Sequence, residues 1–94
     1  QIDGAVSDVM SPYPIDEKFA AFGLFVQTVD GHDFDAIDAA VKRAEQEKGR
    51  PSAIVLKTVK GKGVSFMEDQ AGWHGKAPNE EQAKQAVAEL GGEW

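Results

Sequence analysis

Two short stretches of this sequence contain the residue types that bind and process phosphate ligands. Residues 60–63 read Lys-Gly-Lys-Gly, and residues 72–75 read Gly-Trp-His-Gly. Glycine lets backbone amides come close to an anion, and a lysine ammonium group beside it supplies positive charge. An imidazole can transfer a proton or donate a hydrogen bond to a developing oxyanion. The pattern predicts a ligand-contacting loop in which Lys60 and His74 meet a phosphate-bearing ligand.

Each stretch also has a purely structural interpretation. A Gly/Lys turn after a strand is commonly a solvated turn. Residues 60–63 are not a P-loop, because no helix opens directly after them and no Ser or Thr follows the lysine. His74 can equally be packed by its neighbour Trp73. Residues 30–33, Asp-Gly-His-Asp, suggest a metal or acid–base cluster, but their place between a predicted strand and a predicted helix favours turn and cap chemistry.

Both stretches lie in a loop at residues 57–78, between the apolar run 53–56 and a helix start at Asn79. Connections of about twenty residues are uncommon in compact domains unless they are functional or disordered. Phe66 and Trp73 are residues that a solvated linker avoids, so we expect the loop to be ordered.

The middle of the chain predicts a strand–helix–strand unit. Residues 24–29 and 52–58 are apolar and β-branched, as strands are. Residues 34–48 have apolar side chains at helical spacing, and Asp33 can cap this helix. The apolar positions are Phe34, Ile37, Val41 and Ala44.

The ends of the chain are predicted to be less regular. Residues 1–15 read as an extended lead-in, because two prolines disfavour helix in the residues just before them. A two-turn helix is predicted at 16–22. The last helix begins at Asn79, with Gln82 three residues on to complete a capping box, and the glycines at 91–92 end it. The acids on the two long helices read as exposed faces.

The two predicted strands are expected to be parallel, with a right-handed crossover. Strands this apolar are normally covered on both faces, and a two-stranded sheet is marginal by itself. Three short helices cannot provide that cover well. We therefore expect an α/β chain whose short parallel sheet is the edge of a larger one. Truncation of Phe34 or Ile37 to Ala is expected to destabilise the domain by roughly 2–5 kcal/mol, as for buried apolar side chains.

Length and composition exclude several classes of protein. The 94 residues allow one domain at most, and the net charge of −6 gives no field that attracts nucleic acid or an anionic membrane. The chain has no cysteine and two histidines, so a zinc site would need carboxylates to complete it. Its longest apolar run, residues 19–26, is far short of a bilayer span. Because the chain begins at Gln1 rather than Met, we expect part of a longer or processed protein.

Four segments together resemble the thiamine diphosphate-binding region of transketolase. They are residues 57–69, Lys-Thr-Val-Lys-Gly-Lys-Gly-Val-Ser-Phe-Met-Glu-Asp; residues 72–78, Gly-Trp-His-Gly-Lys-Ala-Pro; residues 29–33, Val-Asp-Gly-His-Asp; and residues 1–4, Gln-Ile-Asp-Gly. The likeness spans almost the whole chain in order, and it is strongest for the separate N-terminal subunits of split bacterial and archaeal transketolases. Deoxyxylulose-phosphate synthases share parts of the loop, but Lys-Ala-Pro at 76–78 looks more like transketolase.

The resemblance implies that residues 1–94 are the C-terminal portion of a diphosphate-binding domain, with part of its doubly wound α/β fold. It implies a cytoplasmic enzyme of the pentose phosphate pathway that uses thiamine diphosphate and magnesium to transfer a two-carbon ketol unit from a ketose phosphate to an aldose phosphate. His74 matches a catalytic histidine that contacts the cofactor diphosphate and the sugar. Lys60 matches a lysine that reaches the cofactor, and Ile2 aligns with a residue that packs near the cofactor ring. His32 has no catalytic counterpart.

The resemblance also places part of the site outside this chain. The Gly-Asp-Gly motif, the following Asn and a backbone carbonyl that hold magnesium would lie before Gln1, so no metal ligand is expected within 1–94. The glutamate that activates the cofactor would come from a pyrimidine-binding domain or subunit, in a homodimer or heterotetramer. We therefore expect the chain alone to be inactive. Two alternatives stay open: a non-catalytic α/β interaction module, and a self-sufficient phosphate-binding domain that uses residues 57–78.

Overall fold

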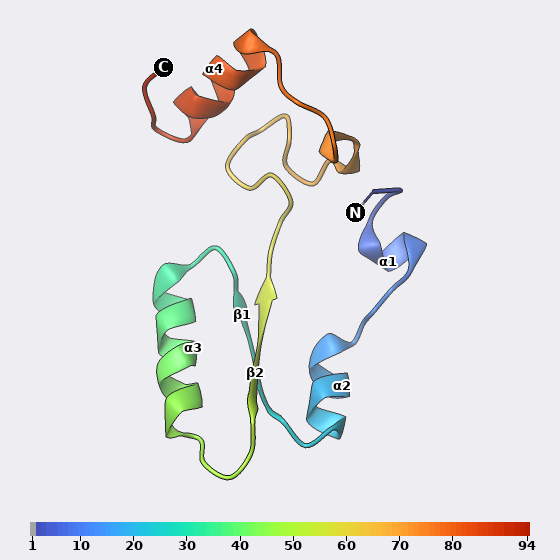
Figure 1. Ribbon diagram of the computed structural model, residues 1–94, viewed down its shortest axis with the longest axis vertical. Coiled ribbons are helices and arrows are strands. Elements are labelled where there is room, and N and C mark those ends of the chain that lie inside the picture. The colour runs from blue at the N-terminus through green and yellow to red at the C-terminus, as the bar shows by residue number, and fades with distance from the viewer. Residues whose placement is uncertain (1) are drawn as a thin grey trace. The chain divides into compact units, whose positions relative to one another are not determined.

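The computed structural model describes residues 2–94, which divide into two compact units. We call Pro12–Thr58 the sheet unit, and residues 2–11 together with Val59–Trp94 the loop unit. In chain order (Figure 1), the elements are α1 (Val6–Val9), α2 (Ile15–Ala21), β1 (Phe25–Asp30), α3 (Phe34–Gln46), β2 (Ser52–Lys57), the 3₁₀ helix η1 (Ala71–Trp73) and α4 (Glu80–Glu89).

The sheet unit is built on two parallel strands. β1 pairs with β2 along its full length, with Phe25 opposite Ser52 and Asp30 opposite Lys57. α3 connects the two strands, and α2 precedes β1. The predicted α/β class, the strand–helix–strand order and the parallel pairing are therefore confirmed.

Two helices cover opposite faces of this sheet. Side chains alternate between the faces along a strand. Gln27 of β1 faces α3, because its Nε2 donates to the carbonyl of Ala40 at 2.8 Å and its Oε1 accepts from Arg43 Nε at 2.6 Å. The next residue, Thr28, faces the other side, where it lines a hollow together with Ile15 of α2. The two hydrogen bonds satisfy a buried amide that would otherwise be costly.

The buried face of α3 differs from the predicted one. Ala40 is fully buried, and Ile37 and Ala44 are half-buried, whereas Phe34 is 88% and Val41 43% exposed. At 3.6 residues per turn, Phe34 and Val41 lie about 100–120° around the helix from Ala40, but Ile37 and Ala44 lie within about 60°. The hydrogen bond that Ala40 accepts from β1 turns this side of α3 toward the sheet. The expectation that Phe34 and Val41 belong to the core is therefore wrong.

The lead-in is also more regular than predicted. α1 forms one helical turn, in which the amides of Asp8 and Val9 donate to the carbonyl of Ala5 at 3.0 and 3.1 Å. Each proline restricts only the residue before it, so Pro12 and Pro14 leave residues 5–10 free to turn. The extended interpretation is wrong for 6–9, and Gln1 lies outside the described residues.

The predicted helix caps are present. Asp33 caps α3 by accepting from the amide of Ala36 at 3.0 Å. At α4, Asn79 Oδ1 accepts from the amide of Gln82 at 2.9 Å, and Gln82 Oε1 accepts from the amide of Asn79 at 3.0 Å. This is a complete capping box. Gly91, with φ +76°, follows the helix and ends it.

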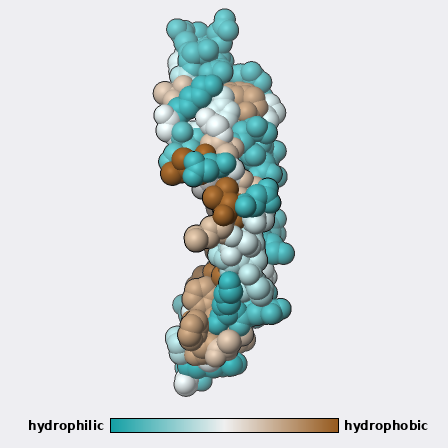
Figure 2. Space-filling view, turned by 90° about the vertical axis from the view of Figure 1, so that its right-hand side faces the viewer, coloured by the Kyte–Doolittle hydropathy of each residue, from teal (hydrophilic) through white to brown (hydrophobic). Residues whose placement is uncertain are grey.

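Few apolar side chains are buried. Within residues 2–94 the buried apolar residues are Ala40 and Val64, while Met10, Phe22 and Trp94 are at least 70% exposed. Figure 2 accordingly shows hydrophobic, brown groups open on the surface. This agrees with the expectation that short helices cover the strands poorly. No helix in the described part of the chain is both long and apolar enough to cross a membrane.

Ile37→Ala and Phe34→Ala form a matched pair that tests which side of α3 is packed. Ile37 is on the buried side, so we expect its truncation to lower the free energy of unfolding by about 1–3 kcal/mol. Phe34 is mostly exposed, and we expect its truncation to change this free energy by less than about 0.5 kcal/mol. Urea unfolding of both variants measures the difference, and equal losses would contradict the assignment.

Candidate functional site

Residues 59–70 of the loop unit fold back on themselves. The amide of Asp69 donates to the carbonyl of Lys60 at 2.8 Å, which brings the two ends of the loop together. Gly61 has φ +69°, and a Cβ there would lie 2.6 Å from the carbonyl oxygen of Met67. Only glycine permits this close backbone approach. The segment is a compact loop rather than an extended linker.

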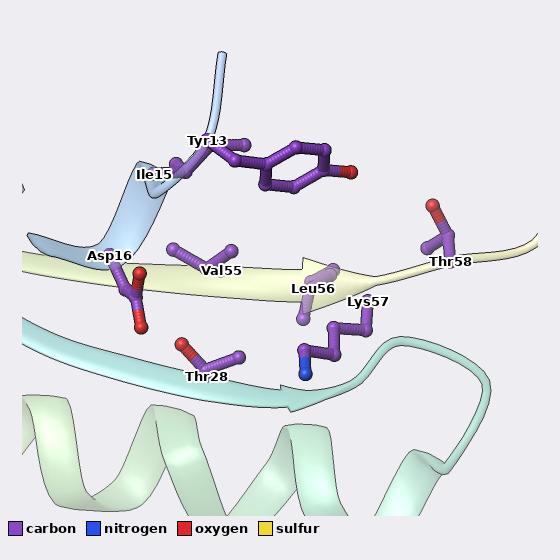
Figure 3. A pocket seen from close by; sticks show the side chains of 8 residues that line it. All are labelled: Tyr13, Ile15, Asp16, Thr28, Val55, Leu56, Lys57 and Thr58. Atoms are coloured by element: carbon purple, nitrogen blue, oxygen red, sulfur yellow. The ribbon is translucent and has the colours of Figure 1, made fainter. Parts of the chain in front are cut away.

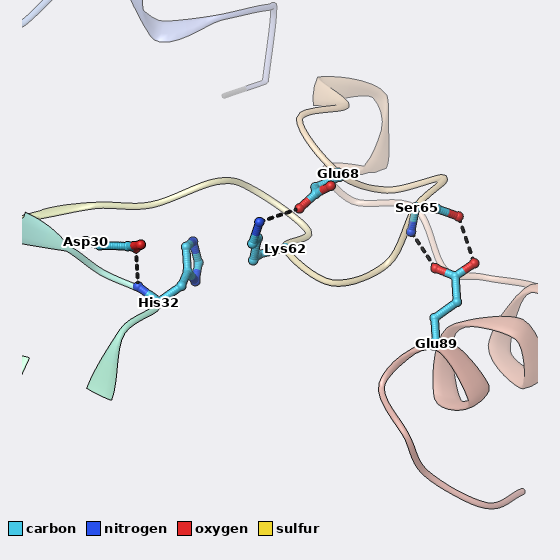
Figure 4. Close-up of polar contacts among 6 residues, drawn as sticks. All are labelled: Asp30, His32, Lys62, Ser65, Glu68 and Glu89. Atoms are coloured by element: carbon cyan, nitrogen blue, oxygen red, sulfur yellow. Dashed lines mark hydrogen bonds and ion pairs between the residues drawn. The ribbon is translucent and has the colours of Figure 1, made fainter. Parts of the chain in front are cut away.

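The closed loop leaves hydrogen-bond donors on its surface. The side chain of Lys60 is half-buried and has no hydrogen-bond or ion-pair partner among residues 2–94. The amides of Gly61 and Gly63 likewise donate to no residue in the described part of the chain. Lys62 instead pairs with Glu68, at 3.2 Å between Nζ and Oε1 (Figure 4). Lys60 is therefore the cation of this loop that is available to an anion.

His74 follows η1 and is open to solvent. Its amide donates to the carbonyl of Ala71 at 3.0 Å, and its imidazole is exposed. Trp73 packs elsewhere: its Nε1 donates to the carbonyl of Phe66 at 2.9 Å, and the two rings meet edge-on with centroids 5.5 Å apart. The ammonium of Lys76 lies 4.5 Å from the centroid of the Trp73 ring. Trp73 therefore packs against Phe66 and Lys76, while the imidazole of His74 is exposed.

Ile2 lines a hollow in the N-terminal segment. Its side chain is 67% exposed and lines a shallow hollow of about 260 Å³. The other lining residues all come from the N-terminal segment: Asp3, Gly4, Val6, Val9 and Met10. The structure thus places Lys60 and His74 in one loop, and neither of them lines the hollow that contains Ile2.

A carboxylate fastens α4 to the loop. Glu89 accepts from the amide of Ser65 at 2.5 Å and from the Ser65 hydroxyl at 2.7 Å (Figure 4). Gln85 donates to the same carboxylate at 2.8 Å. The sequence pattern predicted an exposed helix face for this acid, and Glu89 is exposed, but the pattern did not predict its contact with Ser65. Because 24 residues separate Glu89 from Ser65, no local pattern marks the pair.

These hydrogen bonds change the acidity of Glu89. The amide of Ser65, then Gln85 and the Ser65 hydroxyl, lower the pKa of the Glu89 carboxyl below its ordinary value of 4.5. Because the folded-state pKa is the lower one, the contribution of this carboxylate to stability is present above pH 4.5. It is lost as the pH falls through the folded-state pKa.

The Asp30–Asp33 segment is a turn, as the structural interpretation predicts. Asp30 Oδ1 accepts from the amide of His32 at 2.8 Å, and the amide of Gly31 donates to the carbonyl of Lys57 at 2.8 Å. Asp33 is occupied in capping α3. Within residues 2–94, no three His, Asp or Glu side chains gather in a way that could hold a metal ion.

The sheet unit has a hollow of its own, of about 400 Å³, on the α2 side. Figure 3 shows the ring of Tyr13 above β2 and the side chains of Thr28 and Lys57 beneath it. The remaining lining residues are Ile15, Asp16, Val55, Leu56 and Thr58. None of them is among the predicted site residues.

Residues 1–93 match the family described as the transketolase, thiamine diphosphate binding domain. The chain belongs to this family. The predicted resemblance is confirmed, and the small α/β structure agrees with part of the transketolase N-terminal domain.

Curated relatives of this transketolase domain include subunits as well as whole enzymes. It is 46% identical over 90 residues to the 6-deoxy-6-sulfo-D-fructose transketolase subunit SqwG of Clostridium sp. (strain MSTE9), covering 96% of this chain and 33% of the relative. It is 32% identical over 90 residues to an apulose-4-phosphate transketolase subunit of Actinobacillus succinogenes, covering 96% and 32%. It is 39% identical over 74 residues to transketolase of Pongo abelii, covering 79% and 11%. The chain thus spans about a third of the length of the related subunits.

The loop of this transketolase domain has the donor chemistry that a diphosphate requires. The Lys60 ammonium, the amides of Gly61 and Gly63 and the exposed imidazole of His74 supply positive charge and hydrogen-bond donors. Such groups stabilise phosphate oxygens. In chemical type, these donors suit the diphosphate of the family's cofactor, thiamine diphosphate.

Gly61→Ala is expected to open the closed loop, because the new Cβ would meet the Met67 backbone and the positive φ disfavours a side chain. Gly72→Ala is the matched control, since nothing lies within 4 Å of a Cβ at that position. Hydrogen exchange of the Asp69 amide should be faster in Gly61→Ala and unchanged in Gly72→Ala. Equal exchange in the two variants would show that the close approach does not hold the loop.

Proposed function

We propose that this domain forms part of a transketolase that transfers a two-carbon ketol unit from a ketose phosphate to an aldose phosphate. The observation that carries the proposal is the family match over residues 1–93, which includes the loop with Lys60 and His74. When bound, thiamine diphosphate supplies the nucleophilic carbon for such a transfer. The tasks left to the protein are to bind and orient the cofactor and the sugar, and to transfer protons to and from the sugar.

Lys60 and His74 have side chains suited to those tasks. The ammonium of Lys60 offsets the negative charge of the cofactor diphosphate, and the amides of Gly61 and Gly63 add hydrogen bonds beside it. The imidazole of His74 donates a hydrogen bond to the diphosphate or to the sugar oxygen, and it holds or releases a proton there. Its exposure in this chain leaves it accessible to a substrate.

The rest of the site is proposed to come from outside residues 1–94. The ligands of the magnesium ion that anchors the diphosphate and the acid that activates the cofactor belong to the remainder of the diphosphate-binding domain and to a pyrimidine-binding domain or subunit. Two curated relatives are named as subunits and are about three times as long as the stretch they share with this chain, which supports this division. We propose that the chain alone is inactive.

His74→Ala in the assembled enzyme is expected to lower kcat/KM for the ketose donor by about 10²- to 10⁴-fold, the usual contribution of a positioned acid–base group. Lys60→Ala should chiefly weaken cofactor binding. His32→Ala is the matched control, because His32 lies in the turn between β1 and α3. Steady-state kinetics with a ketose phosphate and with 6-deoxy-6-sulfo-D-fructose, the sugar named for one relative, would measure the effect. An unchanged kcat/KM in His74→Ala for both donors would overturn the assigned role.

Calorimetric titration of thiamine diphosphate and Mg²⁺ into the chain alone is expected to give no binding heat, because the proposed metal ligands lie elsewhere. The assembled enzyme, titrated in the same buffer, is the positive control. Saturable binding to the chain without magnesium would instead favour a self-sufficient phosphate-binding domain. No binding to either would favour a non-catalytic interaction module.

A further inference from the structure

We propose that Glu89 is a positioning residue that holds the Lys60–Gly63 turn in the shape that receives the cofactor diphosphate. This inference rests on the proposed function and extends it to a side chain on α4. Glu89 acts through Ser65 and does not itself touch the ligand.

The contact between Glu89 and Ser65 has the geometry of a fixed attachment. Both donors of Ser65, its amide and its hydroxyl, point to the carboxylate of Glu89, at 2.5 and 2.7 Å (Figure 4). Hydrogen bonds to an ionised acceptor are stronger than neutral ones. Gln85, one turn earlier on α4, donates to Oε1 at 2.8 Å and so orients the carboxylate. A carboxylate with this many donors fixes the position of the Ser65 backbone.

The same end of α4 also contacts the neighbouring glycine. A Cβ on Gly63 would lie 2.9 Å from Cδ2 of Leu90, the residue after Glu89. Between Gly63 and Ser65, the side chain of Val64 is one of the two buried apolar residues found within 2–94. Three consecutive residues of the loop are therefore held in place: one by packing, one by burial and one by hydrogen bonds.

The contacts of α4 with Gly63 and Ser65 also affect the position of Lys60, because backbone hydrogen bonds connect these parts of the loop. The loop is closed by the hydrogen bond from Asp69 to the carbonyl of Lys60, and the amide of Val64 donates to the carbonyl of Gly61 at 3.1 Å. A shift of Gly63–Ser65 would therefore shift the turn that carries the Lys60 ammonium. The amides of Gly61 and Gly63 remain without a partner in residues 2–94. The contacts made by α4 therefore leave these hydrogen-bond donors available to an anion.

The charge of Glu89 allows a decisive test. A carboxylate near a bound diphosphate repels it, so electrostatics alone predicts that Glu89→Gln tightens cofactor binding. Positioning predicts the opposite. The two donors of Ser65 are bound by different oxygens of Glu89, and in a glutamine one of these two positions becomes an NH₂ donor. The sign of the change therefore separates the two effects.

The experiment measures thiamine diphosphate affinity of the assembled enzyme, with magnesium, for wild type, Glu89→Gln and Ser65→Ala. Glu81→Gln is the control, since Glu81 is exposed in the first turn of the same helix. We expect Glu89→Gln to raise the Kd about tenfold and Glu81→Gln to change it by less than about twofold. At saturating cofactor, kcat of Glu89→Gln should stay near the wild-type value. Without cofactor, exchange of the hydrogen-bonded amides of Lys62 and Val64 should be faster in Glu89→Gln than in Glu81→Gln.

Three outcomes would overturn the inference. One is an unchanged or tighter Kd in Glu89→Gln, and another is unchanged exchange of the Lys62 and Val64 amides. The third is an unchanged Kd in Ser65→Ala, measured if Glu89→Gln fails to assemble. Ser65→Ala removes the hydroxyl donor and leaves α4 intact. A wild-type enzyme that binds no thiamine diphosphate would instead overturn the proposed function. A raised Kd in Lys60→Ala together with an unchanged Kd in Glu89→Gln would overturn this inference alone.

Discussion

Burial in this chain is thin, and that constraint makes specific polar contacts decide how its elements meet. Ala40 and Val64 are the buried apolar residues of the described chain, and neither is large. Gln27 is therefore important for the packing of α3 on the sheet, because its buried side-chain amide joins β1 to the carbonyl of Ala40 and to Arg43. Such a contact costs free energy if it is left unsatisfied, so it selects one rotation of α3 against the sheet.

In the loop unit, too, specific hydrogen bonds rather than a large apolar core hold the chain in place. Its closure depends on backbone hydrogen bonds and on Gly61, where a side chain would meet Met67. The indole of Trp73 ties the segment before His74 to the carbonyl of Phe66, so both predicted functional side chains belong to one connected set of turns. A loop that is ordered before a ligand arrives loses less entropy on binding. The Lys60 ammonium and the amides of Gly61 and Gly63 take no part in these hydrogen bonds, so they are available to an anion.

Local signals were reliable where one residue acts on its own backbone neighbourhood. Asp33 and Asn79 cap their helices because a short polar side chain reaches an amide three residues away, and this geometry needs no other element. The strands also lie within one residue of their predicted limits, because β-branched and apolar residue types favour extended backbone. The lead-in was misjudged because the proline rule was extended beyond the single residue that it governs.

The sequence by itself determined the family, the α/β order, the helix caps and the loop that carries Lys60 and His74. Those features depend on residue types at short spacing, or on a motif read as a whole. The tertiary structure alone decided that Phe34 faces solvent and that Glu89 binds Ser65. Helical periodicity fixes which residues share a face, but the partner fixes which face is packed. A hydrogen bond across 24 residues likewise exists only after the chain has folded.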